Sequence, residues 1–462
     1  MSFRKILLAA VALPLVFATA APVSAESLKG ALAKAYANNP DLNSARAALR
    51  ATDENVTIAK AGYRPQIGAS ASGTVTNVRD MSSGADDYTY RSGEVGISIT
   101  QVIFDGFQTL SRVRSAESGV YAGQENLKAN EIQILLSAVQ AYADIARDQQ
   151  VVAIRKQNLA FLNEQLNAAK TRLDVGEGTR TDVSQAEAQL AAGKALLAAA
   201  VAQLKISRAT YVQIVGEEPR DIRQPAPASS GLPRQLDSAV QVAMTQHPSV
   251  KAALHAVDAA GYQVDEANGT LLPGVSLKGT VGRSGSDLEG GFLSSAGNDS
   301  TAGSITAQVT IPIYQGGAEY GRIRQAKENL GAQQIRVDSV RAQIQQMVVS
   351  AYAQLEAAQA AISANQQQLN AAKLALEGVI EERNVGQATT LDVLNAQQQV
   401  LNAKESLAQS GRNAVVASYS ALAAMGRLTV ADQGLQVAEY RSNDHYEAVK
   451  DKWFGLRTVD IK

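Results

Sequence analysis

The stretch Ile103-Phe104-Asp105-Gly106 returns 210 positions later as Ile313-Tyr314-Gln315-Gly316, and this recurrence decides how the chain folds. A match that holds its register over most of a chain indicates a structural duplication. Each copy is therefore expected to be one architectural unit that is used twice. The other matched pairs are Asn39-Pro40 with His247-Pro248 and Pro65 with Pro273, at a spacing of 208, and Tyr142 with Tyr352, Val175-Gly176 with Val385-Gly386 and Asp182-Val183 with Asp392-Val393, at a spacing of 210.

A proline separates a helical pattern from a strand pattern in each copy. Pro65 and Pro273 follow helical stretches at 27–62 and 235–269 and act as structural breakers, because proline lacks the backbone donor and clashes with the preceding turn. Apolar residues then alternate with polar ones, which predicts a β-hairpin at about 66–104 in the first copy and at about 274–314 in the second. The alternating apolar residues are Val95, Ile97 and Ile99, and Ile305, Ala307, Val309, Ile311 and Ile313.

The two hairpins supply four strands in total, and polar connections are expected near 80–87 and 284–300. Four strands are too few to close a barrel, and an open sheet leaves two unpaired edges. One apolar and one polar face would suit a transmembrane β-barrel. The sequence therefore predicts an oligomer that completes the sheet.

Long helical stretches without proline follow each hairpin, at 107–174 and 318–384. At 1.5 Å per residue, each would span roughly 100 Å. Each stretch ends at a Val-Gly turn and resumes as a second helix that ends near Val215 or Leu428. A heptad-like 3-4 spacing predicts that the helices pair as coiled coils. It is carried by Leu159, Leu162, Leu166, Ala169 and Leu173, and by Leu369, Ala372, Leu376 and Val379.

The N-terminus has the features of a secretory signal peptide over residues 1–25. Arg4 and Lys5 precede an apolar stretch at 6–21, and Val23-Ser24-Ala25 offers a small-residue cleavage site before Glu26. The mature chain is therefore expected to leave the cytoplasm. Downstream apolar runs are broken by Gln, Asn, Lys or Asp, so we expect no membrane-spanning helix.

The amino-acid composition excludes some classes of partner and of fold. The formal net charge is −1, which gives no indication of a nucleic-acid partner. The chain has no cysteine, so we expect neither a disulfide nor a lipidated cysteine. It has a single Trp and few Phe, but much Ala and Gln. This composition favours closely packed long helices over thick globular cores.

These patterns divide the chain into five parts. A first repeat covers 26–217 after the signal peptide, with long helices at about 107–215. A proline-rich linker covers 218–234. A second repeat covers 235–428, with long helices at about 318–428. The remaining tail, 429–462, has an irregular pattern in which Trp453-Phe454 could form a local packing anchor.

The duplicated order of helix, hairpin, long helix, Val-Gly turn and long helix resembles the TolC family of outer-membrane efflux proteins. The resemblance extends over the mature chain to about Leu428. Its more specific residues are Asn39-Pro40, Tyr63-Arg64-Pro65, Phe104-Asp105-Gly106-Phe107, Tyr314-Gln315-Gly316-Gly317, Val385-Gly386 and Leu391-Asp392-Val393-Leu394.

The resemblance implies an α+β membrane protein in the outer membrane of a Gram-negative bacterium. It implies a homotrimer whose strands form one 12-stranded β-barrel among the outer-membrane lipids, continued through the periplasm by a long α-helical barrel. The Val-Gly turns, Val175-Gly176 and Val385-Gly386, would contact a periplasmic adaptor protein, which connects the channel to an inner-membrane pump of RND or ABC type. The implied function is an exit duct for efflux or type I secretion.

Asp182 and Asp392 occupy equivalent places just after the two turns. The resemblance implies that acidic residues here constrict the periplasmic entrance as a gate. The local sequences Thr179-Arg180-Thr181-Asp182 and Thr389-Thr390-Leu391-Asp392 also fit an acidic helix capping box, so a structural role stays open.

The chain departs from the better-known family pattern near this gate. Asn395 stands where some relatives carry a second acidic residue, and Ala388 stands where they place an arginine in the turn. The links that keep the gate closed must therefore differ. Our hypothesis is that Arg383 or Arg180 pairs with Asp182.

The usual catalytic patterns are absent from the sequence, and we expect neither an enzyme nor a cofactor. His247, His255 and His445 give no metal set without cysteine. Gly176-Glu177-Gly178 lacks the third glycine and the preceding strand of a nucleotide-binding loop. The alternative to a duct is a periplasmic adaptor or structural protein made of coiled-coil hairpins without a pore. Drug efflux and protein secretion both remain open as the transported cargo.

Overall fold

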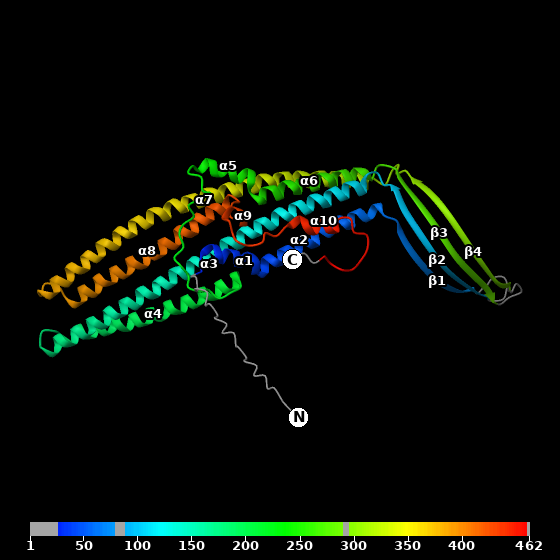
Figure 1. Cartoon of the computed structure of the whole chain (residues 1–462). Helices are drawn as coiled ribbons and strands as arrows, with labels where there is room; N and C mark the ends of the chain where they lie inside the picture. The colour runs from blue at the N-terminus through cyan, green and yellow to red at the C-terminus, as the bar shows by residue number, and fades with distance from the viewer. Residues whose placement is uncertain (1–25, 79–87, 290–294, 460–462) are drawn as a thin grey trace, which may run out of the picture.

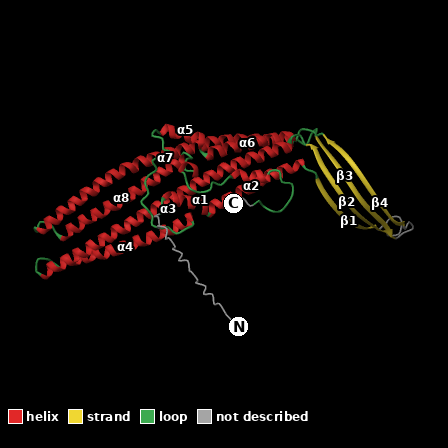
Figure 2. Ribbon diagram, in the orientation of Figure 1, coloured by secondary structure: helices red, strands yellow, loops and turns green. Residues whose placement is uncertain are grey.

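A computed structural model describes residues 26–78, 88–289 and 295–459 of the chain; the expected signal peptide lies outside them. The molecule is elongated (Figure 1). Four strands lie at one end, two long helical hairpins point to the other end, and short helices cover the middle (Figure 2). The predicted duplicated unit of helix, hairpin and long helices is confirmed.

Each helical stretch that precedes a hairpin is two helices, where we expected one. The first copy has α1 (Leu28–Asn38) and α2 (Pro40–Lys60), followed by the 3-10 turn η1 (Ala61–Tyr63). The second has α5 (Leu236–Gln246) and α6 (Pro248–Gly269). The prediction was wrong because a proline forces the residue before it out of the helical region.

Asn39 and His247 occupy these breaks, with ψ angles of 124° and 127°. Both side chains then cap the helix that follows. The Asn39 Oδ1 accepts a bond from the Leu42 backbone N at 3.0 Å, and the His247 Nδ1 accepts one from the Ser249 backbone N at 3.1 Å. The matched pairs therefore mark helix breaks with built-in N-caps.

The strands form one antiparallel sheet in the order β1-β2-β3-β4. They are β1 (Gln66–Val78), β2 (Tyr88–Phe104), β3 (Gly274–Glu289) and β4 (Ser295–Thr310). Pro65 and Pro273 stand directly before β1 and β3. β3 pairs with β2 along its length, and β1 and β4 are the two edges.

Two expectations about the second hairpin were wrong. The polar connection expected at 284–300 is mostly strand, because β3 pairs with β2 as far as Glu289 and β4 begins at Ser295. Strand pairing therefore overrides the glycine-rich composition of this stretch. The hairpin also ends at Thr310, before 314, since Pro312 has no donor for a ladder bond.

The register places most apolar side chains of the four strands on one face of the sheet. Ile67 pairs with Ile99, Ile97 pairs with Val281, and Val275 pairs with Val309. The opposite face carries mainly Ser, Thr, Gly, Gln and Lys, together with Glu94, Tyr90 and Val102. The apolar face is Ile67, Ala69, Ala71, Val95, Ile97, Ile99, Val275, Leu277, Val281, Ile305, Ala307 and Val309.

Two long antiparallel hairpins make up the helical part. The first is α3 (Gln108–Asp174) with α4 (Arg180–Val215), and the second is α7 (Ala318–Asn384) with α8 (Thr390–Ala424). The leucine seams lie where the helices meet. Leu162, Leu166 and Ala169 are buried against α4, and Leu369 is buried against Val400 and Ala403 of α8.

One described helix, α4, has the length and apolar composition of a membrane span, contrary to the sequence-based expectation. Its apolar character comes largely from alanine. Because α4 packs along α3 as one arm of a hairpin, we interpret it as a coiled-coil helix.

The largest core lies in the middle of the molecule, where both repeats meet. Tyr36 of α1, Tyr142 of α3 and Leu422 of α8 are almost fully buried there. The Tyr142 hydroxyl donates to the Glu26 backbone O at 2.7 Å. The proline-rich segment crosses the same region, and the Ala228 backbone N donates to the Ser418 Oγ at 2.8 Å.

As far as residue 459, the tail after Leu428 consists of two short helices joined by irregular stretches. It contains α9 (Val430–Gln433) and α10 (Ser442–Val449). The buried His445 of α10 contacts the fully buried Asp53 of α2, with 2.8 Å between Nδ1 and Oδ2. Trp453-Phe454 is not a packing anchor, because 62% of Trp453 and 88% of Phe454 are exposed.

Candidate functional site: the tips of the helical hairpins

The two Val-Gly turns form the ends of the molecule farthest from the sheet (Figure 1). Gly176 and Gly386 have φ angles of +83° and +79°, which favour glycine and end a helix in the left-handed conformation. The bonds Glu177 N to Arg172 O at 2.9 Å and Gln387 N to Glu382 O at 2.8 Å close both turns.

The valines before these glycines are exposed although they are apolar. Val175 is 66% exposed and Val385 is 70% exposed. Each turn is a rigid, hydrogen-bonded loop that presents one valine to its surroundings. Such a surface is suited to contact with another protein.

Asp182 and Asp392 both take part in complete capping boxes. The Asp392 Oδ2 accepts the Thr389 backbone N at 2.8 Å, and the Asp392 backbone N donates to the Thr389 Oγ1 at 3.2 Å. The corresponding Asp182 and Thr179 distances are 3.0 and 3.1 Å. Both carboxylates therefore have a structural role.

Asp392 nevertheless remains exposed, together with Asn395 on the next turn of α8. The bonds from the Thr389 side chain and backbone hold the pKa of Asp392 below its ordinary value. A charged carboxylate thus stands at the tip of the second hairpin, while Asp182 is half-buried at the tip of the first.

Arg383 has a different partner from the one we expected. Its Nη1 donates to the Gln165 Oε1 of α3 at 2.6 Å. Within the part of the chain that the structure describes, no ion pair joins Asp182 to Arg383 or to Arg180, which is exposed. Within one protomer the capping box engages the Asp182 carboxylate, and the link from Asp182 to either arginine stays a prediction.

The Arg383 guanidinium is half-buried between the hairpins. Burial lowers its pKa from the usual value, and the nearby Arg172 lowers it further. Its Nε is buried without a hydrogen-bond partner among the described residues. This half-buried arginine joins the two hairpins just behind their tips.

Four further polar contacts between α3 and α8 continue this connection toward the middle of the molecule. One of them joins Arg147 to Gln409 at 3.3 Å. We call the other three, together with the Arg383 contact, the cross-hairpin links. The strongest joins Arg155 to both carboxylate oxygens of Glu405, at 2.6 and 3.1 Å. The others are Gln165 with Arg383 at 2.6 Å, Asn158 with Gln397 at 2.8 Å and Asp144 with Arg412 at 2.9 Å.

Sequence reasoning missed the cross-hairpin links, because each joins residues more than two hundred positions apart. A signal was nevertheless present. The polar residues Asp144, Arg155, Asn158 and Gln165 recur at helical spacing along one face of α3. Polar residues on an otherwise packed face indicate a partner helix that also carries polar side chains.

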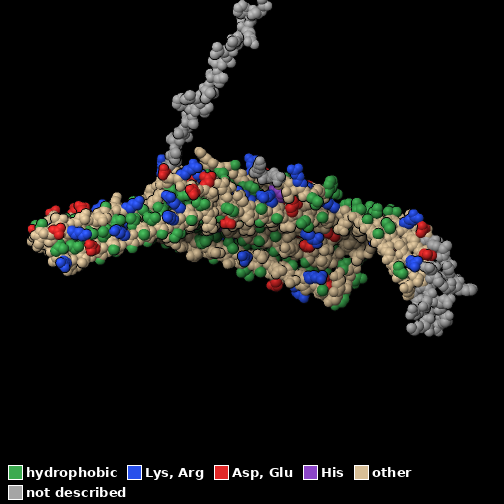
Figure 3. All heavy atoms as spheres, turned by 90° about the horizontal axis from the view of Figure 1, so that it is seen from below, with side chains coloured by type: hydrophobic (Ala, Val, Ile, Leu, Met, Phe, Trp, Pro, Cys, Tyr) green, Lys and Arg blue, Asp and Glu red, His purple; other side chains and the backbone are tan. Residues whose placement is uncertain are grey.

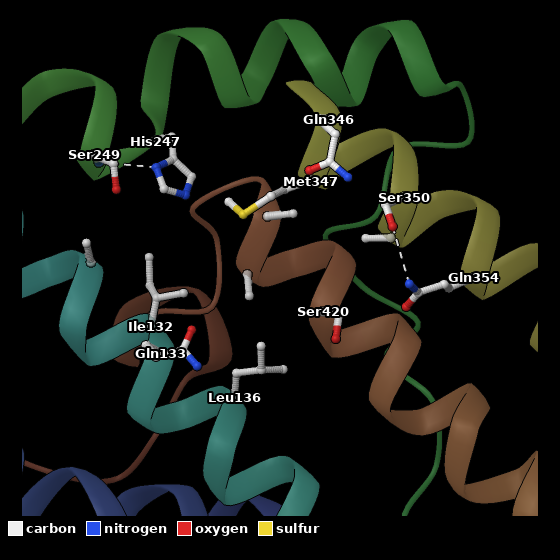
Figure 4. A pocket seen from close by; sticks show the side chains of 14 residues that line it. Ile132, Gln133, Leu136, His247, Ser249, Gln346, Met347, Ser350, Gln354 and Ser420 are labelled. Carbon is white, nitrogen blue, oxygen red and sulfur yellow. Dashed lines mark hydrogen bonds between the residues drawn. The ribbon is translucent and has the colours of Figure 1, made fainter. Parts of the chain in front are cut away.

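One cavity lies elsewhere, among α3, α6, α7 and α8, and measures about 330 Å³ (Figure 4). Its labelled side chains are Ile132, Gln133, Leu136, His247, Ser249, Gln346, Met347, Ser350, Gln354 and Ser420. Burial lowers the pKa of His247 to about 4, so this histidine is neutral. None of the predicted tip residues lines this cavity.

The described residues contain no cluster of three or more His, Asp or Glu that could hold a metal ion. Lys, Arg, Asp and Glu side chains are interspersed over the visible helical face (Figure 3). A single-sign patch that would attract a polyanion is not seen on that face.

Comparison with known proteins places this architecture in a family. A profile of the family described as "Outer membrane efflux protein" matches residues 31–217 and 239–427. The outer membrane efflux protein BepC of Brucella suis biovar 1 (strain 1330) is 48% identical over 457 residues, 99% of this chain and 98% of BepC. The outer membrane protein TolC of Escherichia coli (strain K12) is 24% identical over 88% of this chain and 84% of TolC.

Solved structures show the same fold. The CmeC outer membrane channel of Campylobacter jejuni superimposes with a TM-score of 0.76 at 17% identity, covering 93% of this chain and 90% of that chain. CusC superimposes with a TM-score of 0.73 at 18% identity, covering 87% and 92%.

The chain belongs to the outer membrane efflux protein family. It is an outer-membrane channel that extends into the periplasm, as the resemblance to the TolC family implied. The alternative of a coiled-coil adaptor without a pore is not favoured.

Proposed function

We propose that this chain is one third of a trimeric exit duct. The observation that carries the proposal is the sheet, which has one mostly apolar face and two open edges, β1 and β4. Three copies joined edge to edge would give twelve strands without an unpaired edge. Their apolar faces would contact the outer-membrane lipid, and their polar faces would line the pore.

The two helical hairpins would extend this pore through the periplasm. α3 and α7 each have 67 residues, which corresponds to roughly 100 Å at 1.5 Å per residue. Their many Ala residues allow close packing, and their Gln residues suit a water-filled lumen. Six hairpins from three chains would surround the channel.

The tips would contact a periplasmic adaptor protein. The exposed Val175 and Val385, each held in a closed turn by Gly176 or Gly386, provide equivalent contacts on both hairpins. The adaptor would connect the duct to an inner-membrane pump of RND or ABC type, which supplies the energy.

The cross-hairpin links would hold the periplasmic entrance closed. Opening would move the α7–α8 hairpin away from α3 and would break the contacts of Arg383 and Arg155. In the trimer, the exposed Asp392 and Asn395 would recur three times around the entrance. A ring of Asp392 carboxylates favours cations, and Asn395 keeps the ring less acidic than a double carboxylate ring would be.

Relatives of this chain differ in their named cargo. One is an alkaline protease secretion protein of Pseudomonas aeruginosa, and another is a cation efflux system protein of Escherichia coli. The same duct therefore serves very different substrates, and we propose that selection belongs to the pump. We assign the chain no catalytic role, since its relatives are transport proteins.

The absence of cysteine from the sequence allows a direct test. One cysteine is introduced on the polar face of β1, at Ser70, and is combined with single cysteines along β4, from Ala302 to Thr310. Oxidation in cells is expected to give a covalent trimer, recovered from the outer-membrane fraction, for the pair in register. A monomer in the soluble periplasmic fraction, without cross-links at any position, would overturn the proposal.

A further inference from the structure

The tail ends its described part in a small closed loop that exposes large apolar side chains. We call Lys452–Arg457 the Trp-Phe loop. Trp453 is 62% exposed, Phe454 is 88% exposed and Leu456 is fully exposed, at 105%. Three apolar side chains held in water by an ordered loop need a partner that covers them.

The loop is built to present these side chains outward. The Lys452 Nζ donates to the Arg457 backbone O at 2.6 Å and closes the loop. Gly455 has a φ of +114°, a conformation that side-chain-bearing residues rarely adopt.

Arg64 attaches the loop to the base of the sheet. Its Nη1 donates to the Lys452 backbone O at 2.8 Å, and its guanidinium lies over the Trp453 ring at 4.9 Å from the ring centre. Arg64 is followed by Pro65, and β1 begins at Gln66. The loop is thus held at the boundary between helices and strands (Figure 1).

Two contacts fix the approach of the tail to this boundary. The Thr57 Oγ1 donates to the Val449 backbone O at 2.7 Å, and Lys60 pairs with Asp451 at 2.7 Å. The tail therefore follows α2 as far as the strands. Two other exposed aromatic residues lie at the same boundary. Tyr63, at the end of η1, is 51% exposed, and Phe107, which follows β2, is 56% exposed.

We propose that the Trp-Phe loop is an interfacial anchor in the periplasmic leaflet of the outer membrane. Phe454 and Leu456 enter the outer part of the acyl region, and Trp453 lies among the headgroups, where its amphipathic ring is favoured. Arg457 and Arg64 face the anionic phosphates of the lipid headgroups. Ile67, which is 70% exposed and starts the apolar face of the sheet, follows Arg64 by three positions.

This anchor rests on the proposed placement of the sheet in the outer membrane. The Trp-Phe loop lies on the C-terminal tail, after α10. Its contact with the membrane would therefore be additional to the contacts made by the barrel strands. By tying the tail to the membrane, the loop would fix the height of the helical tunnel relative to the bilayer.

Trp453 is the single tryptophan of the chain, so its fluorescence reports on the loop alone. The full-length protein is reconstituted into vesicles of phosphatidylethanolamine and phosphatidylglycerol, with or without acyl chains brominated near the headgroup. We expect the brominated lipid to reduce the Trp453 emission, and we expect aqueous acrylamide to quench it poorly. A matched control, Trp453→Phe with Val385→Trp, places the tryptophan at the periplasmic tip, where acrylamide quenches it and brominated lipid does not.

Two results would overturn the anchor. Trp453 that is quenched by acrylamide and insensitive to brominated lipid would show a loop in water. Trp453 protected from both quenchers would show that a neighbouring protein chain covers the loop. Phe454→Ser with Leu456→Ser should weaken quenching by brominated lipid while the trimer and its conductance persist. Loss of the trimer in the parent protein would instead contradict the proposed function.

Discussion

Arg155 of α3 and Glu405 of α8 form an ion pair with two bonds across the two helical hairpins, at 2.6 and 3.1 Å. Their side chains are 19% and 25% exposed. Arg155→Ala should weaken the contact between the hairpins by on the order of 1–2 kcal/mol, because a charge-assisted two-bond contact is lost. The expected result is a higher single-channel conductance in planar bilayers and greater antibiotic uptake by cells.

Arg112→Ala is the matched control for this prediction. It removes an ion pair from the same helix, Arg112 with Glu266 at 2.7 Å, but that pair joins α3 to α6 rather than to α8. The charge exchange Arg155→Glu with Glu405→Arg should restore the closed state. If Arg155→Ala and Arg112→Ala conduct equally, the pair does not hold the gate.

The two roles of Asp392 can be separated by substituting each member of its capping box. Asp392→Asn removes the charge and keeps an oxygen acceptor for Thr389, so we expect weaker cation preference with little change in thermal stability. Thr389→Ala keeps the charge and removes the cap of α8, which should cost about 1 kcal/mol. Reversal potentials in a salt gradient and thermal melts measure the two effects. Unchanged ion selectivity in Asp392→Asn would leave Asp392 with a capping role alone.

The selectivity due to Asp392 should also resist acid. Its bonds to Thr389 lower the pKa of the carboxyl from the ordinary value of 3.8. A carboxyl with a depressed pKa stays charged above that pKa and loses its charge only as the pH falls through it. Cation preference should therefore persist at pH 4, and a loss between pH 6 and pH 5 would point to another group.

His445 is expected to hold the tail on α2. Its removal leaves the buried Asp53 carboxyl without its hydrogen-bond partner, and a buried polar group left unpaired costs about 1–3 kcal/mol. Burial raises the pKa of Asp53, and the bond to His445 opposes that rise. His445→Ala should increase hydrogen exchange across Ser442–Val449. His255→Ala, which removes a more exposed histidine near Asp258, should leave α10 protected. Equal protection of α10 in both variants would contradict this role.

Glu131 of α3 should make the central core less stable as pH rises. Burial raises its pKa from 4.5 to about 7, although Arg46 and the Tyr36 hydroxyl, 3.3 Å away, oppose the shift. The folded chain therefore binds this proton more tightly than the unfolded chain. Its contribution is greatest below pH 4.5 and is lost as the pH rises through 7, by on the order of 2–3 kcal/mol.

Glu131→Gln should remove this pH dependence and raise the melting temperature at pH 7.5. Glu125→Gln, which alters a carboxylate paired with Lys128 on the same helix, should retain it. Thermal melts between pH 4.5 and pH 7.5 compare the two variants with the parent chain. A parent stability that does not fall over this range would contradict the assignment.

The repeat, the strands and the seams could be predicted from the sequence because each has its own local period. Leu162 and Leu166 follow a helical spacing, and Val95, Ile97 and Ile99 follow a strand spacing. The helix breaks at Pro40 and Pro248 were also visible in the sequence. The prediction nevertheless gave one helix at 27–62 and one at 235–269, because the apolar periodicity continues across each proline.

The cross-hairpin links and the contacts of the tail could not be predicted in the same way. Arg155 and Glu405 meet only after two hairpins have folded and packed side by side. Asp53 and His445 are separated by 392 positions, and neither carries a local signal of its partner. The tip residues were located correctly by the repeat, but their bonds depend on side-chain geometry, which left Asp182 with Thr179 rather than with an arginine.

The equal length of α3 and α7, each with 67 residues, limits which insertions and deletions such chains can accept during evolution. Both tips must end on one level if six hairpins are to form an even rim. Loss of one heptad from α3 alone would withdraw its tip by about 10 Å and open a notch in that rim. A change in tunnel length must therefore occur in both halves of the chain together. The lengths of α3 and α7, although far apart in the sequence, are constrained to stay equal.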